Sequence, residues 1–196
     1  MKFALRRGLR AALAPLAMAL VAAALAGCSD PFKLKASYAN EPFVFSLYAL
    51  TGQGPLNAPS ALDLTARSVV RADGTFGFDV AFDLDRRGKI LIYPQKLVGS
   101  SISGARTVGL QRVSGAYESL VIGPPTNYQP DSILAINVGE PVAIRLTSSS
   151  CVYQLSTELY AKIVVDSVVS GGLIFGRGVF NPNCGFRSFA DGIPDK

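Results

Sequence analysis

The chain has 196 residues, no histidine and a formal net charge of +5. Four of its nineteen Lys and Arg residues lie within residues 1–10, so the other fifteen are nearly balanced by fourteen acidic residues. This balance excludes the basic surface that nucleic-acid binding needs, and the missing histidine excludes Ser-His-Asp and Cys-His catalysis and histidine zinc sites.

Residues 1–27 have the three zones of a secretory signal. Basic side chains occupy residues 1–10, an apolar run covers 11–24, and the sequence Leu-Ala-Gly-Cys follows at 25–28. A membrane-spanning helix needs about 20 apolar residues, whereas this run is shorter and contains Pro15. We therefore expect residues 1–27 to be removed as a signal peptide after export.

The Leu-Ala-Gly-Cys sequence at 25–28 resembles the lipobox of bacterial lipoproteins, and the resemblance covers residues 1–29 only. It implies cleavage between Gly27 and Cys28, followed by acylation of the Cys28 thiol and, in many members, of the new amine. Two or three acyl chains hold a protein firmly to a lipid bilayer, whereas one is marginal. Because Ser29 rather than an aspartate follows the cysteine, the resemblance also implies sorting to the outer membrane of the cell envelope.

The two remaining cysteines, Cys151 and Cys184, predict one disulfide, because an exported chain folds in an oxidising compartment. Chain entropy gives such a loop a stabilisation of roughly 3 to 4 kcal/mol. Two buried free thiols are the alternative. A redox pair fits less well, since the spacing is not Cys-x-x-Cys.

The mature chain divides into a short tether and one domain. Residues 28–42 are polar and contain prolines, and a flexible segment of that length spans only about 20 Å in root-mean-square terms. Residues 43–196 are enough for a single domain with its own core.

Hydrophobic alternation is clearest in residues 75–85, which predict a strand with one buried and one wet face. Strands at 64–71 and 89–98 flank it across turn sequences, so the three are expected to form a meander. One face of the central strand carries Phe76, Phe78, Val80, Phe82 and Leu84, and the other carries Gly77, Asp79, Ala81, Asp83 and Asp85.

Further β-rich runs follow, separated by clusters of Gly, Pro, Asn and Ser. About ten strands at this spacing predict an all-β fold, a single antiparallel β-sandwich, with a closed β-barrel as the second choice. The later strands are expected at 108–113, 116–122, 132–138, 142–147, 159–169 and 173–180.

Asp79, Asp83 and Asp85 are weak candidates for a calcium site, since their carboxylates share the polar face of the predicted strand. A calcium loop starting at Asp83 would need an oxygen donor at its fifth position and a glutamate at its twelfth, and Arg87 and Pro94 stand there. The favoured interpretation is a solvated, charged face, so we expect no metal and no cofactor.

Tyr128 is the candidate ligand contact, because it lies among prolines and polar residues in the loop 123–131, where a ring could stack on a sugar or a peptide. The favoured interpretation is that Tyr128 folds back to cover the sandwich edge. Phe186 and Phe189 are expected in the core.

These patterns favour a non-catalytic envelope lipoprotein that binds the bilayer through acylated Cys28 and that binds another envelope protein or a glycan, or supports an assembly as a structural module. A lipocalin-like carrier of an apolar ligand is an alternative, although the chain lacks the Gly-x-Trp signature and contains no tryptophan. A glycan hydrolase with two facing carboxylates is a third possibility, supported by no particular spacing of the acidic residues.

Overall fold

The computed structural model describes residues 35–52, 54–73, 75–98, 106–154 and 156–194. Contacts divide the chain into two units, Met1–Lys35 and Ala36–Lys196, and the second unit is the domain described below. The predicted signal peptide, Gly27 and Cys28 lie outside the described residues.

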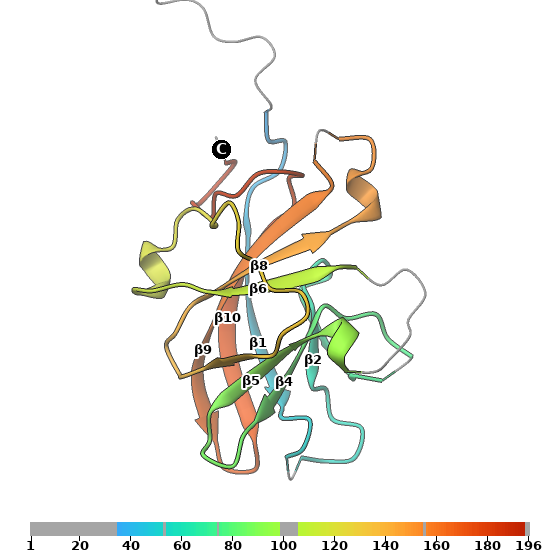
Figure 1. The fold of residues 1–196 in the computed structure, drawn as a ribbon, viewed down its shortest axis with the longest axis vertical. Coiled ribbons are helices and arrows are strands. Elements are labelled where there is room, and N and C mark those ends of the chain that lie inside the picture. Colours follow the sequence, from blue (N-terminus) through green and yellow to red (C-terminus); the bar gives the residue numbers. More distant parts are fainter. Residues whose placement is uncertain (1–34, 53, 74, 99–105, 155, 195–196) are drawn as a thin grey trace, which may run out of the picture. The chain divides into compact units, whose positions relative to one another are not determined.

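The described strands form two antiparallel five-stranded sheets (Figure 1). The first sheet has the order β1 (Glu41–Tyr48), β10 (Leu173–Asn181), β9 (Glu158–Val169), β8 (Val142–Thr147) and β6 (Val108–Arg112). The second has the order β3 (Ser68–Val70), β2 (Ala61–Asp63), β4 (Val80–Leu84), β5 (Ile90–Pro94) and β7 (Leu134–Ile136). The two sheets are separate, so the predicted all-β sandwich is confirmed over the closed barrel.

The helices in the described part of the chain are three short 3-10 turns. They are η1 (Gln95–Leu97), η2 (Tyr117–Ser119) and η3 (Ser149–Cys151). Within the same ranges, no helix is long and apolar enough to cross a membrane.

The main core lies between the sheets and follows from alternation along the strands. In β1, Phe45 and Leu47 point inward and are buried, whereas Val44 and Ser46 are exposed. The Phe45 ring lies 5.5 Å from the ring of Phe82 on β4, which joins the two sheets. Each fully buried side chain of this size contributes roughly 1.5 to 3 kcal/mol.

Two glycines allow β1 to pack closely on β10. Gly178 lies opposite Phe43 and Gly176 lies opposite Phe45. A Cβ atom on Gly178 would meet the Phe43 ring and would lie 2.7 Å from the carbonyl oxygen of Lys162. The missing side chains therefore leave room for the two phenylalanine rings over the inner face of β10.

The predicted strand at 75–85 is shorter than expected, and both of its faces are covered. β4 begins at Val80. On the side that was predicted to be wet, Ala81 is buried and packs with Ala61 and Phe78 in a second hydrophobic cluster. The meander prediction is also wrong, because β2 pairs with both β3 and β4 and so lies between them. The β4–β5 hairpin is confirmed.

Residues 116–122 do not form the predicted strand. Tyr117–Ser119 is the 3-10 helix η2, and Ile122 makes only an isolated bridge with Ser188. Tyr117 and Leu120 are buried while Glu118 is exposed. This segment covers the outer face of the first sheet instead of extending it.

Candidate functional site

One end of the domain is fixed by the disulfide between Cys151 and Cys184, which the structure confirms. Cys151 ends η3, and Cys184 follows β10. The bond therefore joins the loop after β8 to the segment that leaves the last strand. Cys151 is fully buried, which keeps this junction inside the body of the domain.

Asparagine side chains hold the beginning of the domain to that same segment. The side-chain oxygen of Asn183 accepts hydrogen bonds from the backbone N–H groups of Ser37 and Tyr38, at 2.8 and 3.0 Å. Its amide nitrogen donates to the Tyr38 carbonyl at 2.8 Å. Asn40 donates to the carbonyl of Ser188 at 2.9 Å. Residues 37–42, predicted as part of the tether, therefore belong to the body of the domain.

We name this part of the molecule the tether end. It consists of the described residues of 36–40, 148–157 and 181–186, joined by the disulfide and the asparagine contacts. In Figure 1 these segments lie together, at the same end of the sandwich as the label C.

The three candidate calcium ligands have separate partners. Asp79 is fully buried, and its carboxylate accepts hydrogen bonds from Arg106 Nε at 2.6 Å and from the Leu64 N–H at 2.8 Å. Burial raises the pKa of Asp79 to about 6, although Arg106 opposes the shift. Arg106 also pairs with Asp63 at 2.9 Å. This cluster joins the segment after β2 to the start of β4, and its carboxylates are already engaged by the guanidinium.

Asp83 and Asp85 are likewise engaged in local structure. Asp83 is buried and accepts hydrogen bonds from the N–H and the hydroxyl of Thr51, at 3.0 and 2.7 Å. Asp85 accepts from the N–H groups of Arg87 and Lys89 within the β4–β5 turn. Among the residues that the structure describes, no three His, Cys, Asp or Glu side chains are grouped so as to hold a metal ion. The solvated-face interpretation holds for Asp85 but is wrong for Asp79 and Asp83, which are buried and bonded to Arg106 and to Thr51, respectively.

Tyr128 is buried, with only 5% of its surface exposed, so the prediction that it contacts a ligand is wrong. Its ring lies 6.1 Å from the ring of Tyr160 in an edge-to-face arrangement, and the Arg145 guanidinium lies 5.1 Å from its centroid. The favoured interpretation, that Tyr128 folds back onto the sandwich, is confirmed. Phe186 and Phe189 are also buried, as expected.

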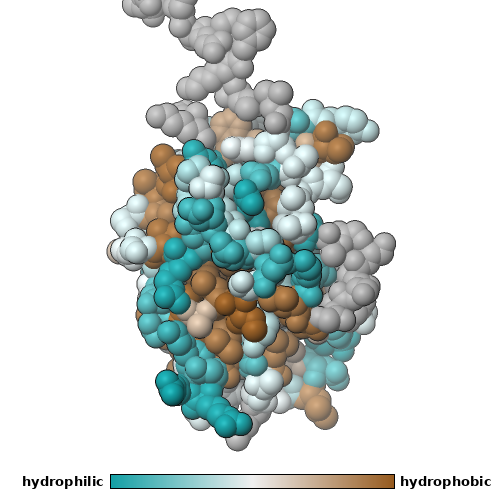
Figure 2. Space-filling model, in the orientation of Figure 1, coloured by the Kyte–Doolittle hydropathy of each residue, from teal (hydrophilic) through white to brown (hydrophobic). Residues whose placement is uncertain are grey.

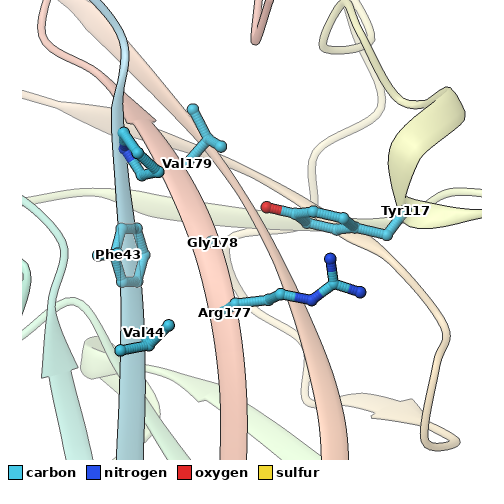
Figure 3. A pocket seen from close by; sticks show the side chains of 7 residues that line it. Phe43, Val44, Tyr117, Arg177, Gly178 and Val179 are labelled. Atoms are coloured by element: carbon cyan, nitrogen blue, oxygen red, sulfur yellow. The ribbon is translucent and has the colours of Figure 1, made fainter. Parts of the chain in front are cut away.

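The first sheet carries an open groove of about 410 Å³ on its outer side, where β1 and β10 lie next to η2 (Figure 3). The groove is mostly apolar, and Val44 on the edge strand is 81% exposed beside it. Its lining consists of Pro42, Phe43, Val44, Tyr117, Arg177, Gly178 and Val179. In Figure 3, the Tyr117 ring and the Arg177 side chain project toward each other across this side of β10.

Arg177 lies over the Tyr117 ring, 4.7 Å from its centroid. The same guanidinium pairs with Asp166 and Glu118, each at 3.1 Å. The single positive charge of Arg177 is thereby more than balanced by two carboxylates at the rim of the groove. The groove therefore offers an apolar floor and no uncompensated positive charge, which suits an apolar side chain better than an anion.

Lys162, which the sequence prediction missed, lies beneath the same segment. Only 5% of its surface is exposed, and its Nζ donates to the carbonyls of Tyr117 and Leu120, at 3.2 and 2.9 Å. Nζ also lies 4.2 Å from the centroid of the Tyr117 ring. Desolvation by burial lowers the pKa of this amine. The signal for it was a lysine inside the otherwise apolar run 159–165.

The described domain thus presents two surfaces of interest, the groove beside Tyr117 and the tether end. Figure 2 shows that hydrophobic residues on the visible face of the molecule lie in separate patches among hydrophilic ones. No protein-family model, curated protein or solved structure matches the chain.

Proposed function

We propose that this protein is a cell-envelope lipoprotein, anchored in the outer membrane through acylated Cys28, whose sandwich is a non-catalytic module that binds another envelope protein or a glycan. The observation that carries the proposal is the Leu-Ala-Gly-Cys sequence at 25–28, placed directly after an apolar run with a basic start. The first described hydrogen bond to the sandwich is made by the backbone N–H of Ser37, nine positions after Cys28. Nine extended residues reach about 30 Å at most, so the domain is held close to the bilayer.

The packed interior favours surface binding over the lipocalin-like alternative. Side chains from both sheets fill the space between them, including Phe45, Phe82 and Ile144. A carrier would need a cavity in this place, whereas the groove lined by Tyr117 and Arg177 lies on the outer side of the first sheet. A module with a filled core and an outer groove is suited to binding a partner by contact.

The engagement of the acidic residues favours a binding role over the hydrolase alternative. A glycosidase needs two carboxylates that face each other across a cleft. Asp79 is bonded to Arg106, and Asp83 is bonded to Thr51, so neither faces such a cleft.

The anchor is tested by the intact mass of the membrane-extracted protein, compared with a Cys28→Ala variant. We expect a chain that starts at Cys28 and carries acyl chains, and a Cys28→Ala variant that keeps residues 1–27 and gains no lipid. A native chain without acyl mass would contradict the proposal.

The binding role is tested with a photo-crosslinking residue placed in turn at Val44 and at Leu56 of the anchored protein. Val44 borders the groove, and Leu56 is a matched control because it is 96% exposed in the loop after β1. A discrete adduct from Val44 alone would support binding at the groove. Equal labelling from both positions would contradict a specific site there.

A further inference from the structure

The segments that form the tether end carry no charged side chain. Their described residues, 36–40, 148–154, 156–157 and 181–186, include no Asp, Glu, Lys or Arg. The charged residues that border these segments in the sequence are Lys35, Glu41, Glu158 and Arg187, and Glu41 pairs with Arg67. These three adjoining segments therefore form a surface whose described residues carry no formal charge.

Large apolar and aromatic side chains project from the same uncharged segments. Tyr153 is 97% exposed, Tyr38 is 65% exposed and Val152 is 59% exposed. Tyr38 and Tyr153 belong to distant parts of the sequence, but the disulfide and the Asn183 contacts bring their segments together. A tyrosine ring with its polar hydroxyl favours the boundary between hydrocarbon and water, where membrane proteins concentrate Tyr and Trp.

The opposite end of the sandwich combines an uncharged loop, 49–60, with a charged turn. β1 runs from the tether end, at Glu41, to Tyr48, and the loop that follows bonds to β4 through Leu50 and Thr51. The β4–β5 turn at that end carries Asp85, Arg86, Arg87 and Lys89. Figure 1 shows the β4–β5 turn at the far end of the domain from residues 36–40. The two ends therefore differ in the β4–β5 turn, which is charged, whereas the described segments of the tether end carry no charge.

We infer that the tether end docks on the bilayer surface, with Tyr153, Tyr38 and Val152 at the level of the lipid headgroups. This inference rests on the proposed anchoring at Cys28. A tether of nine residues that ends at Ser37 delivers this end of the domain, and not another, to the membrane. The tether raises the local concentration of the tether end at the bilayer surface. Weak contacts between the two are therefore enough to hold the domain in this orientation.

The absence of tryptophan from the chain allows a direct test by fluorescence. Three acylated proteins, each with one reporter, are placed in phosphatidylcholine vesicles whose acyl chains are brominated near the headgroups. The reporters are Tyr153→Trp and Tyr38→Trp at the tether end and Leu56→Trp as the control at the far end, where Leu56 is 96% exposed. We expect both tether-end reporters to shift to the blue and to be quenched by about half, with no change for Leu56→Trp.

The outcomes separate docking from anchoring. Acylated protein whose tether-end reporters are quenched no more than Leu56→Trp overturns the docking and leaves the anchor intact. Protein without acyl mass on Cys28 overturns both. Because the docking segments are uncharged, the quenching should persist at 1 M salt, and its loss there would show that Lys35 and other charges hold the domain instead.

Discussion

Lys162 of β9 donates a hydrogen bond from Nζ to the carbonyl oxygen of Leu120 over 2.9 Å, although the two residues are 42 positions apart. The same amine reaches the carbonyl of Tyr117. This buried cation therefore helps to hold the end of η2 on the outer face of the first sheet, where Tyr117 lines the groove.

Replacement of Lys162 by Met should weaken this attachment. Met keeps most of the length and the apolar stem but leaves the carbonyls of Tyr117 and Leu120 without their donor. We expect the free energy of unfolding in urea to fall by about 1 to 3 kcal/mol. Lys96→Met is the control, because that side chain is exposed and its pair with Asp131 is worth little. Equal stability of the two variants would contradict the role given to Lys162.

Asp79 should make a contribution to stability that decreases as the pH rises. In the unfolded chain its carboxyl ionises from about pH 4, whereas burial raises its pKa in the folded domain to about 6. As the pH rises, the carboxyl therefore loses its proton in the unfolded state first. The free energy of unfolding falls by up to about 3 kcal/mol between those two pH values. The stability difference between the native protein and Asp79→Asn should shrink from pH 4 to pH 6 in urea unfolding.

Asp85 provides a control of opposite sign for that experiment. Backbone hydrogen bonds, first from Lys89 and then from Arg87, lower the pKa of Asp85. The contribution of Asp85 to stability is present above the pKa of the unfolded chain and is lost as the pH falls. The difference in free energy of unfolding between the native protein and Asp85→Asn should therefore grow as the pH rises. The same trend for both aspartates would contradict the assignment for Asp79.

The Cys151–Cys184 disulfide should stabilise the domain and order the tether end. Changing both cysteines to Ala removes a link between positions 33 residues apart, and a loop of that size is worth about 3 to 4 kcal/mol. Hydrogen exchange should also speed up at Ser37 and Tyr38, whose amides are held by Asn183 beside Cys184. An unchanged exchange rate at these amides would show that the asparagine contacts are independent of the disulfide.

Gly178→Ala should disturb the packing of β1 on β10. The added Cβ would lie 2.7 Å from the Lys162 carbonyl oxygen and would also meet the Phe43 ring, and a backbone atom cannot move aside easily. We expect a loss of about 1 to 3 kcal/mol in thermal or urea unfolding. Gly77→Ala is the control, since a Cβ there meets nothing within 4 Å and the backbone is not left-handed. Similar losses for both variants would exclude close packing as the cause.

Much of the fold could be predicted because it depends on local alternation. β8 has the predicted bounds, 142–147, and β9 and β10 begin within one residue of their predicted starts. The disulfide could also be predicted, since assigning Cys28 to lipid left only two cysteines. β2 could not be found in this way, because its three residues are too few to show a period.

The sequence by itself determined the β-rich class and left Cys151 and Cys184 as the two cysteines that could pair, and it predicts the route through the lipobox, because each depends on residue type and spacing along the chain. Only the tertiary structure decided on which strands the outer face is also buried, beneath another segment of the chain. Alternation distinguishes two faces of a strand, but it does not reveal that a distant segment packs on the outer one. For that reason Tyr128 and Asp79 are buried instead of exposed, and Lys162 lies within the domain.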